Sequence, residues 1–463
     1  MLNKRTKHIH CIGIGGIGVS ALAELLLARG YVVSGSDIKA SQNTERLQQL
    51  GIKIAIGHRA ENVNGADHVI YSSAISRSNP EIIIAEQNKV PVLARGEVLA
   101  ELVNSYSAIA IAGTHGKTTT TGLCAHILVQ AGFDPSFAIG GIMMNQSSPV
   151  YVGKNKYFVV EVDESDASFL FMKPFYAVLT NIDTDHLGTY GGEFETLKKS
   201  FMDYVAKIPK EGAAVVCIDD PVIRELIPQM KSRLITYGFS EDAMIRASDF
   251  RQYGLVSEFT VNFSGKNTLP VKLIIPGRHN ALNALAAITI ANELGVPHDR
   301  IQDALATFPG MGRRFHVHGQ MKTANGKALI IEDYGHHPRE IQATLDAAKM
   351  TWPHKRIVLV FQPHRYTRTR DLYPEFIEVL RKAHKLYLME IYGAGEEALE
   401  NISSIRMVNE IAGETMTKPD YVMDLNALPK TLYDSLQDDD VVILQGAGTI
   451  GSMAKNLMQY DEK

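Results

Sequence analysis

The segment SAIAIAGTHGKTTTTG, residues 107–122, decides the fold of this chain. An apolar run of strand-forming residues leads into Gly113 and Gly116, and a lysine followed by threonines then begins a helical stretch. Glycines let backbone N–H groups approach phosphate oxygens, and the N-terminus of the helix adds the positive end of its dipole. The segment therefore predicts a strand, a phosphate-binding loop and a helix, in that order.

The side chains of this loop predict how a nucleotide would be held. Lys117 can reach the β- and γ-phosphates, and the Thr118 hydroxyl can ligate Mg²⁺. The strict GxxxxGK[ST] pattern needs glycine where this chain has Ile111, so we predict a shortened variant. The alternative is a glycine-rich turn that happens to contain a lysine. The residues predicted to bind ATP here are Gly113, Thr114, His115, Gly116, Lys117, Thr118 and Thr119.

Two further apolar strands predict the metal ligands. YFVVEVDESDAS (157–168) carries Glu161 among valines, where a carboxylate needs a partner, and TNIDTDHLGTYGG (180–192) carries His186. Because the carboxyl ends of parallel strands meet at one edge of a sheet, we expect both residues near Lys117, binding metal or phosphate. The alternatives are a solvated acidic loop and a structural histidine.

Strand-like and helical stretches alternate along the whole chain, which predicts an α/β fold with mostly parallel sheets. A length of 463 residues favours about three domains. We predict a Rossmann-like domain at 1–106, a P-loop-type ATPase domain at 107–311 and a second Rossmann-like domain at 312–463. The Gly/Arg-rich segment PGMGRRF (309–315) marks the second boundary.

Composition limits the class of protein. The formal net charge of −4 argues against a nucleic-acid partner, and three scattered cysteines without a CxxC pair favour a reducing compartment. No apolar run reaches the roughly 18 residues of a membrane span, and we interpret the N-terminus as a strand and turn rather than a signal peptide. We expect a cytoplasmic protein that acts on small molecules without membrane insertion, as a monomer or homodimer.

A glycine fingerprint near the N-terminus suggests a different class of enzyme. Gly13, Gly15 and Gly18 form GxGxxG after a predicted strand, and Asp37 ends the next strand. This pattern is typical of dinucleotide binding, so an NAD-dependent oxidoreductase is an alternative. However, the pattern recurs at 446–451, and hydride transfer has no use for a phosphate loop with acidic metal ligands. The fingerprint supports only a diphosphate at the first turn, such as that of a UDP-sugar.

The third section contains two segments dense in polar side chains, EDYGHHPRE (332–340) and FQPHRYTRTRDL (361–372). Arginine binds carboxylates and phosphates through two parallel hydrogen bonds, so these segments favour a pocket for an anionic substrate. A zinc site at His336–His337 is disfavoured because no Glu-x-x-His spacing on a helix accompanies the pair. A solvated charged surface is the remaining alternative.

The motifs GIGGIG, AGTHGKTTT, VDESDAS, TNIDTDH, HNALNA, GRRF, DYGHHP and FQPHRYTRTRDL follow one another in this chain. Their order resembles that of the Mur ligases of bacterial peptidoglycan synthesis, over essentially the whole chain. The resemblance implies an ATP- and Mg²⁺-dependent ligase that joins L-alanine to the lactyl carboxylate of UDP-N-acetylmuramate through an acyl phosphate. The alternative within the family is the recycling ligase that attaches a tripeptide, and a regulatory NTPase is a more distant one.

The resemblance also implies the roles of individual residues. Those expected to bind the UDP-sugar are Gly13, Gly15, Gly16, Gly18, Asp37, Ser72 and Ser73. His279, Asn280 and Asn283 fall in the adenine and ribose segment. The expected metal ligands are Thr118, Glu161 and His186, and the expected catalytic residues are Lys117, His186, Asp333 and His336. The amino acid is expected to contact Tyr334, His336, Arg365 and Arg368.

This chain departs from the wider family at one position. Several Mur ligases have a carboxylated lysine as a metal ligand 15 residues after the motif histidine, where this chain has Phe201. We therefore do not expect that ligand here.

Overall fold

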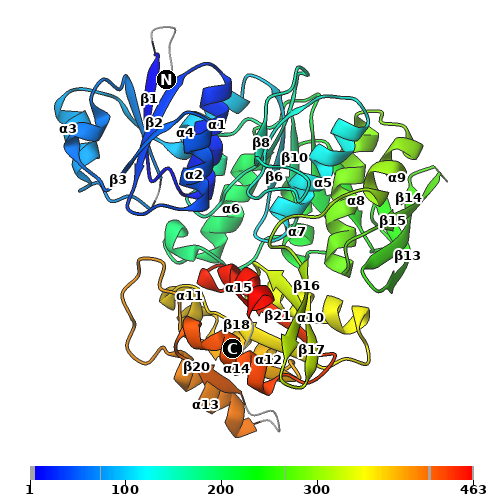
Figure 1. Cartoon of the computed structure of the whole chain (residues 1–463). Helices are drawn as coiled ribbons and strands as arrows, with labels where there is room; N and C mark the ends of the chain where they lie inside the picture. The colour runs from blue at the N-terminus through cyan, green and yellow to red at the C-terminus, as the bar shows by residue number, and fades with distance from the viewer. Residues whose placement is uncertain (1–5, 73, 266, 415–418, 461–463) are drawn as a thin grey trace. The chain divides into compact units, whose positions relative to one another are not determined.

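The computed structural model describes residues 6–72, 74–265, 267–414 and 419–460. These residues form three sheets, with strands in residues 8–94, 107–273 and 316–445 (Figure 1). One compact unit contains the first sheet and most of the second, and another contains the third sheet. The sheets are mostly parallel, which confirms the predicted α/β fold class. The cysteines are free and buried, and no helix in the described ranges is long and apolar enough to cross a membrane.

The first sheet is parallel, with strand order β3-β2-β1-β4-β5. Figure 1 shows α1, α2 and α4 on one of its faces and α3 on the other. The central strand β1 leads directly into the glycine turn before α1. The elements are β1 (His8–Ile12), α1 (Ile17–Ala28), β2 (Val32–Asp37), α2 (Gln42–Gln49), β3 (Lys53–Ile56), β4 (His68–Tyr71), α3 (Pro80–Gln87), β5 (Val92–Ala94) and α4 (Arg95–Val103).

The second sheet has the order β15-β14-β13-β12-β11-β10-β6-β9-β7-β8. Strand β6 pairs in parallel with β9 on one side and β10 on the other, so the carboxyl ends of these three strands meet at one edge. The strands are β6 (Ser107–Ala112), β7 (Ser136–Ala138), β8 (Val150–Tyr151), β9 (Tyr157–Glu161), β10 (Tyr176–Leu179), β11 (Ala213–Cys217), β12 (Leu234–Gly238), β13 (Ile245–Tyr253), β14 (Val256–Phe263) and β15 (Thr268–Leu273). The helices are α5 (Lys117–Gln130), α6 (Phe194–Val205), α7 (Pro221–Leu226), α8 (Arg278–Glu293) and α9 (His298–Ala306).

The third sheet has the order β16-β17-β21-β18-β19-β20. The edge strand β16 pairs antiparallel with β17, and the pairs from β17 through β20 are parallel. The strands are β16 (His316–Thr323), β17 (Gly326–Asp333), β18 (Ile357–Phe361), β19 (Lys385–Met389), β20 (Asp420–Val422) and β21 (Val441–Gln445). The helices are α10 (Pro338–Thr351), α11 (Tyr366–Asp371), α12 (Tyr373–Leu380), α13 (Ser404–Glu414), α14 (Leu428–Ser435) and α15 (Met453–Gln459).

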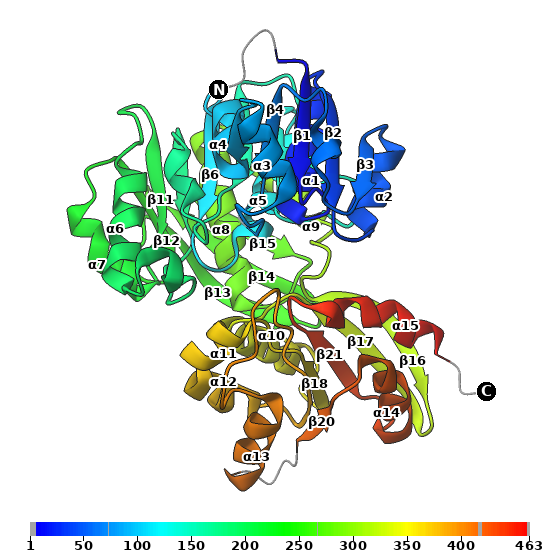
Figure 2. The same ribbon diagram turned by 90° about the vertical axis from the view of Figure 1, so that its left-hand side faces the viewer.

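The third sheet is covered on both faces, which explains why its central strands are continuously apolar. In β18, Leu359 and Phe361 belong to the core beneath α10, α12 and α13, whereas Val358 and Val360 belong to the core beneath α14 and α15. Figure 2 shows these two groups of helices on opposite sides of the sheet. Alternate side chains of a strand point to opposite faces, so each face receives its own apolar layer.

A buried carboxylate holds the first sheet to α3. Glu81 is fully buried; it accepts hydrogen bonds from Ser36 Oγ (2.6 Å) and Asn62 Nδ2 (2.5 Å) and lies 3.3 Å from His10 Nε2. Burial alone would raise the pKa of Glu81, but the hydrogen bonds with His10, Ser36 and Asn62 outweigh it and lower the pKa to about 2. The ionised carboxylate therefore connects β1, β2 and the segment after β3 to the first turn of α3.

We predict that Glu81→Gln destabilises the fold in a pH-dependent way. The pKa of Glu81 lies below the ordinary value of 4.5, so its contribution is complete above about pH 4.5 and is lost as the pH falls toward about 2. At pH 7 the variant should lose about 2 kcal/mol, as expected for hydrogen bonds to a charged group. Calorimetric melting at a series of pH values measures this loss, which should shrink below about pH 4.5.

Glu86→Gln on the same helix is the matched control, because Glu86 is 57% exposed and should change stability little. A loss in Glu81→Gln that stayed constant across the pH range would contradict the role of the ionised form.

Candidate active site

The structure confirms the predicted strand, loop and helix at residues 107–122, and close packing explains the two glycines. Gly113 has φ 128° and Gly116 has φ 80°, which are left-handed values. A Cβ at Gly113 would lie 2.2 Å from Thr180 Oγ1, and one at Gly116 would lie 2.5 Å from Asn283 Oδ1. A side chain at either position would therefore displace the segments that hold the loop.

The end of β10 shapes the phosphate loop through hydrogen bonds. The His115 backbone N–H donates to Asn181 Oδ1 (2.8 Å), and the His115 carbonyl accepts from Thr180 Oγ1 (2.7 Å) and Asn181 Nδ2 (3.0 Å). The Asp183 N–H donates to Thr114 Oγ1 (2.9 Å). The segment that follows β10 thus fixes the backbone of the loop.

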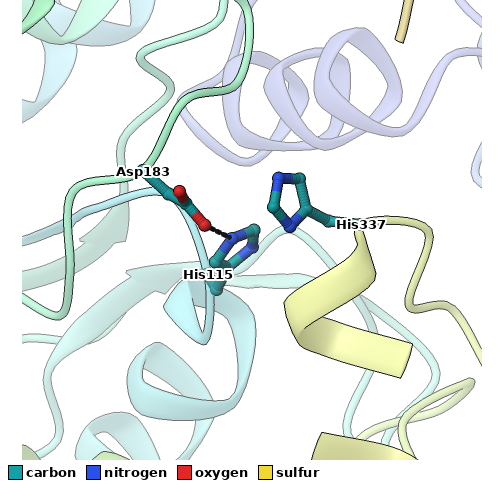
Figure 3. Close-up of side chains that lie close together, drawn as sticks. All are labelled: His115, Asp183 and His337. Carbon is teal, nitrogen blue, oxygen red and sulfur yellow. Dashed lines mark hydrogen bonds and ion pairs between the residues drawn. The ribbon is translucent and has the colours of Figure 1, made fainter. Parts of the chain in front are cut away.

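Asp183 also contacts the His115 side chain, a partnership that the sequence did not reveal. His115 Nε2 lies 3.0 Å from Asp183 Oδ2, and Figure 3 shows this contact as a dashed line. The sequence signal was a pair of aspartates in TNIDTDH, of which the second, Asp185, lies beside His186. Spacing alone could not tell which of the two reaches the loop.

Lys117 is held at the N-terminus of α5 by oxygen atoms. Its Nζ lies 2.6 Å from Gly113 O, 3.0 Å from Thr114 O, and 3.0 and 2.9 Å from the two oxygens of Glu164. Burial raises the pKa of Glu164 to about 7. Burial alone would lower the pKa of Lys117, but the carboxylates around it, above all that of Glu164, raise it. The ammonium is therefore a fixed positive charge next to the loop.

Two of the predicted metal ligands lie together. Thr118 Oγ1 donates to Glu161 Oε1 (3.1 Å), and Glu161 Oε2 accepts from the Gly140 N–H (2.8 Å). A hydroxyl beside a carboxylate is a suitable set of ligands for Mg²⁺. The third predicted ligand, His186, has φ 55° and a ring nitrogen 3.5 Å from Asp185 Oδ2. Its metal role stays a prediction.

Arg95, at the start of α4, links the glycine turn of the first sheet to the acidic segment after β9. Its Nη2 lies 3.6 Å from Asp163 Oδ2 and 3.5 Å from Asp166 Oδ2. A Cβ at Gly18 would lie 2.8 Å from Arg95 Nη1, so the glycine makes room for the guanidinium. Sequence reasoning missed this residue because nothing near VLARGEV marks a partner so distant along the chain.

The structure brings together several residues predicted to bind the UDP-sugar. The Gly15 N–H donates to Asp37 Oδ2 (2.9 Å), Gly13 has φ 74°, and Gly16 is the N-cap of α1. A Cβ at Gly13 would lie 3.6 Å from Ser72 Cβ. Ser73 lies outside the described residues.

The residues of the predicted adenine segment lie at the start of α8. Asn280 Nδ2 donates to Pro276 O (2.7 Å), and burial lowers the pKa of His279 to about 4. Asn283 Oδ1 accepts from Thr120 Oγ1 (3.2 Å), which connects this helix to α5. Asn283 therefore lies beside the phosphate loop.

In the third sheet, Asp333 is a buried acceptor at the end of β17. It accepts from the Phe315 N–H (2.9 Å), the Gly335 N–H (2.8 Å) and Gln445 Nε2 (3.1 Å). Burial raises the pKa of Asp333. These contacts fix the turn that presents Tyr334, whose ring lies 5.4 Å from that of His336. A catalytic role for Asp333 stays a prediction.

The two predicted amino-acid-binding arginines have different partners. Arg368 is buried, with Nη1 3.3 Å from both His364 O and His364 Nδ1. Arg365, at φ 73°, is 45% exposed and lies 3.8 Å from Glu396 Oε1. The His336 and His364 rings lie 5.8 Å apart, so Arg368 belongs to the same cluster as His336. A joint clamp by both arginines stays a prediction.

Phe201 is a core residue of α6. It is fully buried, and its ring lies 5.1 Å from that of Phe169. The nearby Lys198 pairs with Glu195 (2.6 Å) and Glu225 (3.2 Å).

Comparison with known proteins identifies the family. The Mur ligase family catalytic domain matches residues 8–107, the Mur ligase middle domain matches 111–291, and the Mur ligase glutamate ligase domain matches 313–448. The UDP-N-acetylmuramate–L-alanine ligase of Coxiella burnetii strain RSA 493 is 49% identical over 457 residues, 98% of each chain.

Solved structures agree with this match. The UDP-N-acetylmuramate–alanine ligase of Thermotoga maritima matches with a TM-score of 0.84 at 30% identity, over 98% of this chain and 99% of that one. A murein peptide ligase of Psychrobacter arcticus shares the fold, with a TM-score of 0.76 at 24% identity over 99% and 100% of the two chains. This chain therefore belongs to the Mur ligase family.

Proposed function

We propose that the chain joins L-alanine to the lactyl carboxylate of UDP-N-acetylmuramate, with ATP and Mg²⁺, through an acyl phosphate. The observation that carries this is the phosphate loop, where the fixed charge of Lys117 lies next to the Thr118–Glu161 pair. The likeness to alanine-adding ligases over the full chain supports the choice of substrates. It favours them over the tripeptide of the recycling ligase, because the alanine-adding relative from Coxiella burnetii is 49% identical whereas the murein peptide ligase of Psychrobacter arcticus is 24% identical. An oxidoreductase has no comparable support.

We assign the substrates to three domains, with boundaries at 106/107 and 311/312. The glycine turn of the first domain would bind the UDP-sugar diphosphate, and the loop of the second would bind ATP. The third would bind L-alanine through Tyr334, His336, Arg365 and Arg368. The protein would work in the cytoplasm, a reducing compartment that fits its free, buried cysteines.

In the first step a lactyl carboxylate oxygen attacks the γ-phosphorus of ATP, and ADP leaves. Lys117 neutralises charge that develops on the transferred phosphoryl group. Thr118 and Glu161, with His186 as a further candidate, would hold Mg²⁺, which supplies Lewis-acid stabilisation of the phosphate oxygens when bound. In the second step the amine of L-alanine attacks the acyl carbon, and inorganic phosphate leaves. Exclusion of water is required because water would otherwise hydrolyse the acyl phosphate.

We predict that Lys117→Ala abolishes ligation. Loss of a charge aimed at the transferred phosphate costs about 3 kcal/mol or more, so turnover should fall below about a hundredth of the wild-type rate. Phosphate release from MgATP and UDP-N-acetylmuramate, with and without L-alanine, measures both the reaction and its substrates. In the wild type, the rate of phosphate release should depend on both UDP-N-acetylmuramate and L-alanine.

Lys199→Ala is the matched control, since Lys199 is exposed on α6 and should be dispensable. If the wild type released phosphate at the same rate with and without UDP-N-acetylmuramate, that result would contradict the proposed function. A Lys117→Ala variant that kept more than about a tenth of the activity would contradict only the role of the loop.

We predict that Arg365→Lys or Arg368→Lys raises the KM for L-alanine about tenfold or more, because lysine cannot form the bidentate contact with its carboxylate. The KM for ATP should change little. Steady-state kinetics with each substrate varied separately distinguishes the two, and Arg370→Lys, at a side chain 53% exposed, is the control. An effect confined to ATP would rule out the clamp.

We predict that activity does not depend on bicarbonate, because the buried Phe201 ring stands where a carboxylated lysine would be a ligand. Enzyme that has been acidified, degassed and returned to neutral pH should keep its full rate without added bicarbonate. A Mur ligase with lysine at that position is the positive control for the treatment. A loss of rate that bicarbonate restored would refute the prediction.

A further inference from the structure

Two histidines and a glutamate meet where β16 begins and β17 ends. His316 is paired across the strands with Glu332, and His318 lies at a β-bulge on the same strand, between Val317 and Gly319. The rings of His316 and His318 lie 4.1 Å apart, and His318 Nε2 is 2.9 Å from Glu332 Oε2. One ligand atom of each of the three residues lies within 4.8 Å of the others. The set therefore offers two imidazole nitrogens and a carboxylate oxygen to one point.

The carboxylate is held in place from behind. Arg313 Nε lies 2.7 Å from Glu332 Oε1, and Arg313 Nη2 donates to Gly446 O (3.2 Å). A Cβ at Gly451 would lie 2.5 Å from Glu332 Oε1, so that glycine makes room for the pair. Glu332 is only 5% exposed. Its outer oxygen, Oε2, is thus directed at His318 while Oε1 is occupied by the arginine.

The histidines are suited to bind a metal. Both rings lie on β16 beside Glu332, so their nitrogens and the carboxylate can reach one cation together. His318 Nε2 and Glu332 Oε2 lie 2.9 Å apart, close to the spacing of two ligand atoms on one cation. Metal sites orient a ligating carboxylate through a second group that contacts it, as Arg313 contacts Glu332 here.

We propose that His316, His318 and Glu332 form a Zn²⁺ site, with water as the fourth ligand. Zinc takes nitrogen and oxygen ligands at about 2.1 Å in a tetrahedron, so ligand atoms must lie about 3.4 Å apart. The three ligand atoms lie within 4.8 Å of one another, so side-chain shifts of about an ångström would bring them to that spacing. Mg²⁺ prefers an all-oxygen shell, so the imidazoles select against the cation that the phosphate loop would use.

Such a site would act on the fold of the third-sheet unit. It would cross-link the antiparallel edge strand β16 to β17, just after the Arg313–Phe315 segment. Glu332 is also the neighbour of Asp333, which accepts the Phe315 and Gly335 N–H groups. Bound zinc would therefore stabilise the turn that presents Tyr334. This inference does not depend on the proposed function, because metal binding is measured without substrates.

The test is a calorimetric titration of full-length, chelator-treated protein with Zn²⁺, with Co²⁺ absorption to report tetrahedral coordination. The double variant His316→Ala/His318→Ala should lose one site, or bind it at least about tenfold more weakly. The matched control His354→Ala removes an exposed histidine of the same unit and should bind as the wild type does. Zinc should also raise the melting temperature of the wild type more than that of the double variant.

Glu332→Gln is the second variant, because it keeps the shape of the side chain but removes the charged oxygen; it too should lose the site. Each variant is first checked for a cooperative melt without metal. Other histidines and carboxylates can also bind zinc. The proposal is therefore tested by the difference in zinc stoichiometry and affinity between the wild type and the variants. Equal stoichiometry and affinity in the wild type, the double variant and Glu332→Gln would overturn the proposal.

Discussion

The position of β6 between β9 and β10 is the constraint on which the proposed phosphate site depends. Parallel pairing on both sides brings the loop after β6, the acidic segment after β9 and the TNID segment after β10 to one edge. The loop is then packed so closely that a Cβ at Gly113 would lie 2.2 Å from Thr180 Oγ1. The backbone of the loop is thus shaped by its neighbours as well as by its own sequence, and Ile111, where the strict pattern has glycine, belongs to β6.

The two GxGxxG patterns show what a glycine motif does and does not encode. At the first, Asp37 accepts from the Gly15 N–H, and Arg95 lies against Gly18. At the second, Gly451 makes room for the Arg313–Glu332 pair, a contact between side chains of the protein itself. A glycine indicates that the backbone has a positive φ or that a Cβ is excluded, and the excluding group can be a ligand, a backbone or another side chain. The sequence could therefore locate both turns but could not show which group lies against the glycines in each.

The sequence predicted the parts of the site that depend on local order and failed where partners are distant. The strand, loop and helix at 107–122 and the meeting of Thr118 with Glu161 followed from apolar runs that end in polar residues at one sheet edge. Asp183 and Arg95 were missed because their partners are set by how segments pack, which spacing does not report. For the same reason, a separation of three residues did not predict the separate partners of Arg365 and Arg368.

The charge around Lys117 supports the proposed requirement for a divalent cation at this loop. Three carboxylates, those of Glu161, Asp163 and Glu164, act on the one ammonium and raise its pKa. The phosphates of a nucleotide would bring several further negative charges to the same buried edge, where charges are weakly screened. Lysine and the dipole of α5 supply too little positive charge to offset both sets. Under the proposed function these carboxylates would make phosphate binding depend on a cation, and a cation at the Thr118–Glu161 pair would offset charge on both the protein and the nucleotide.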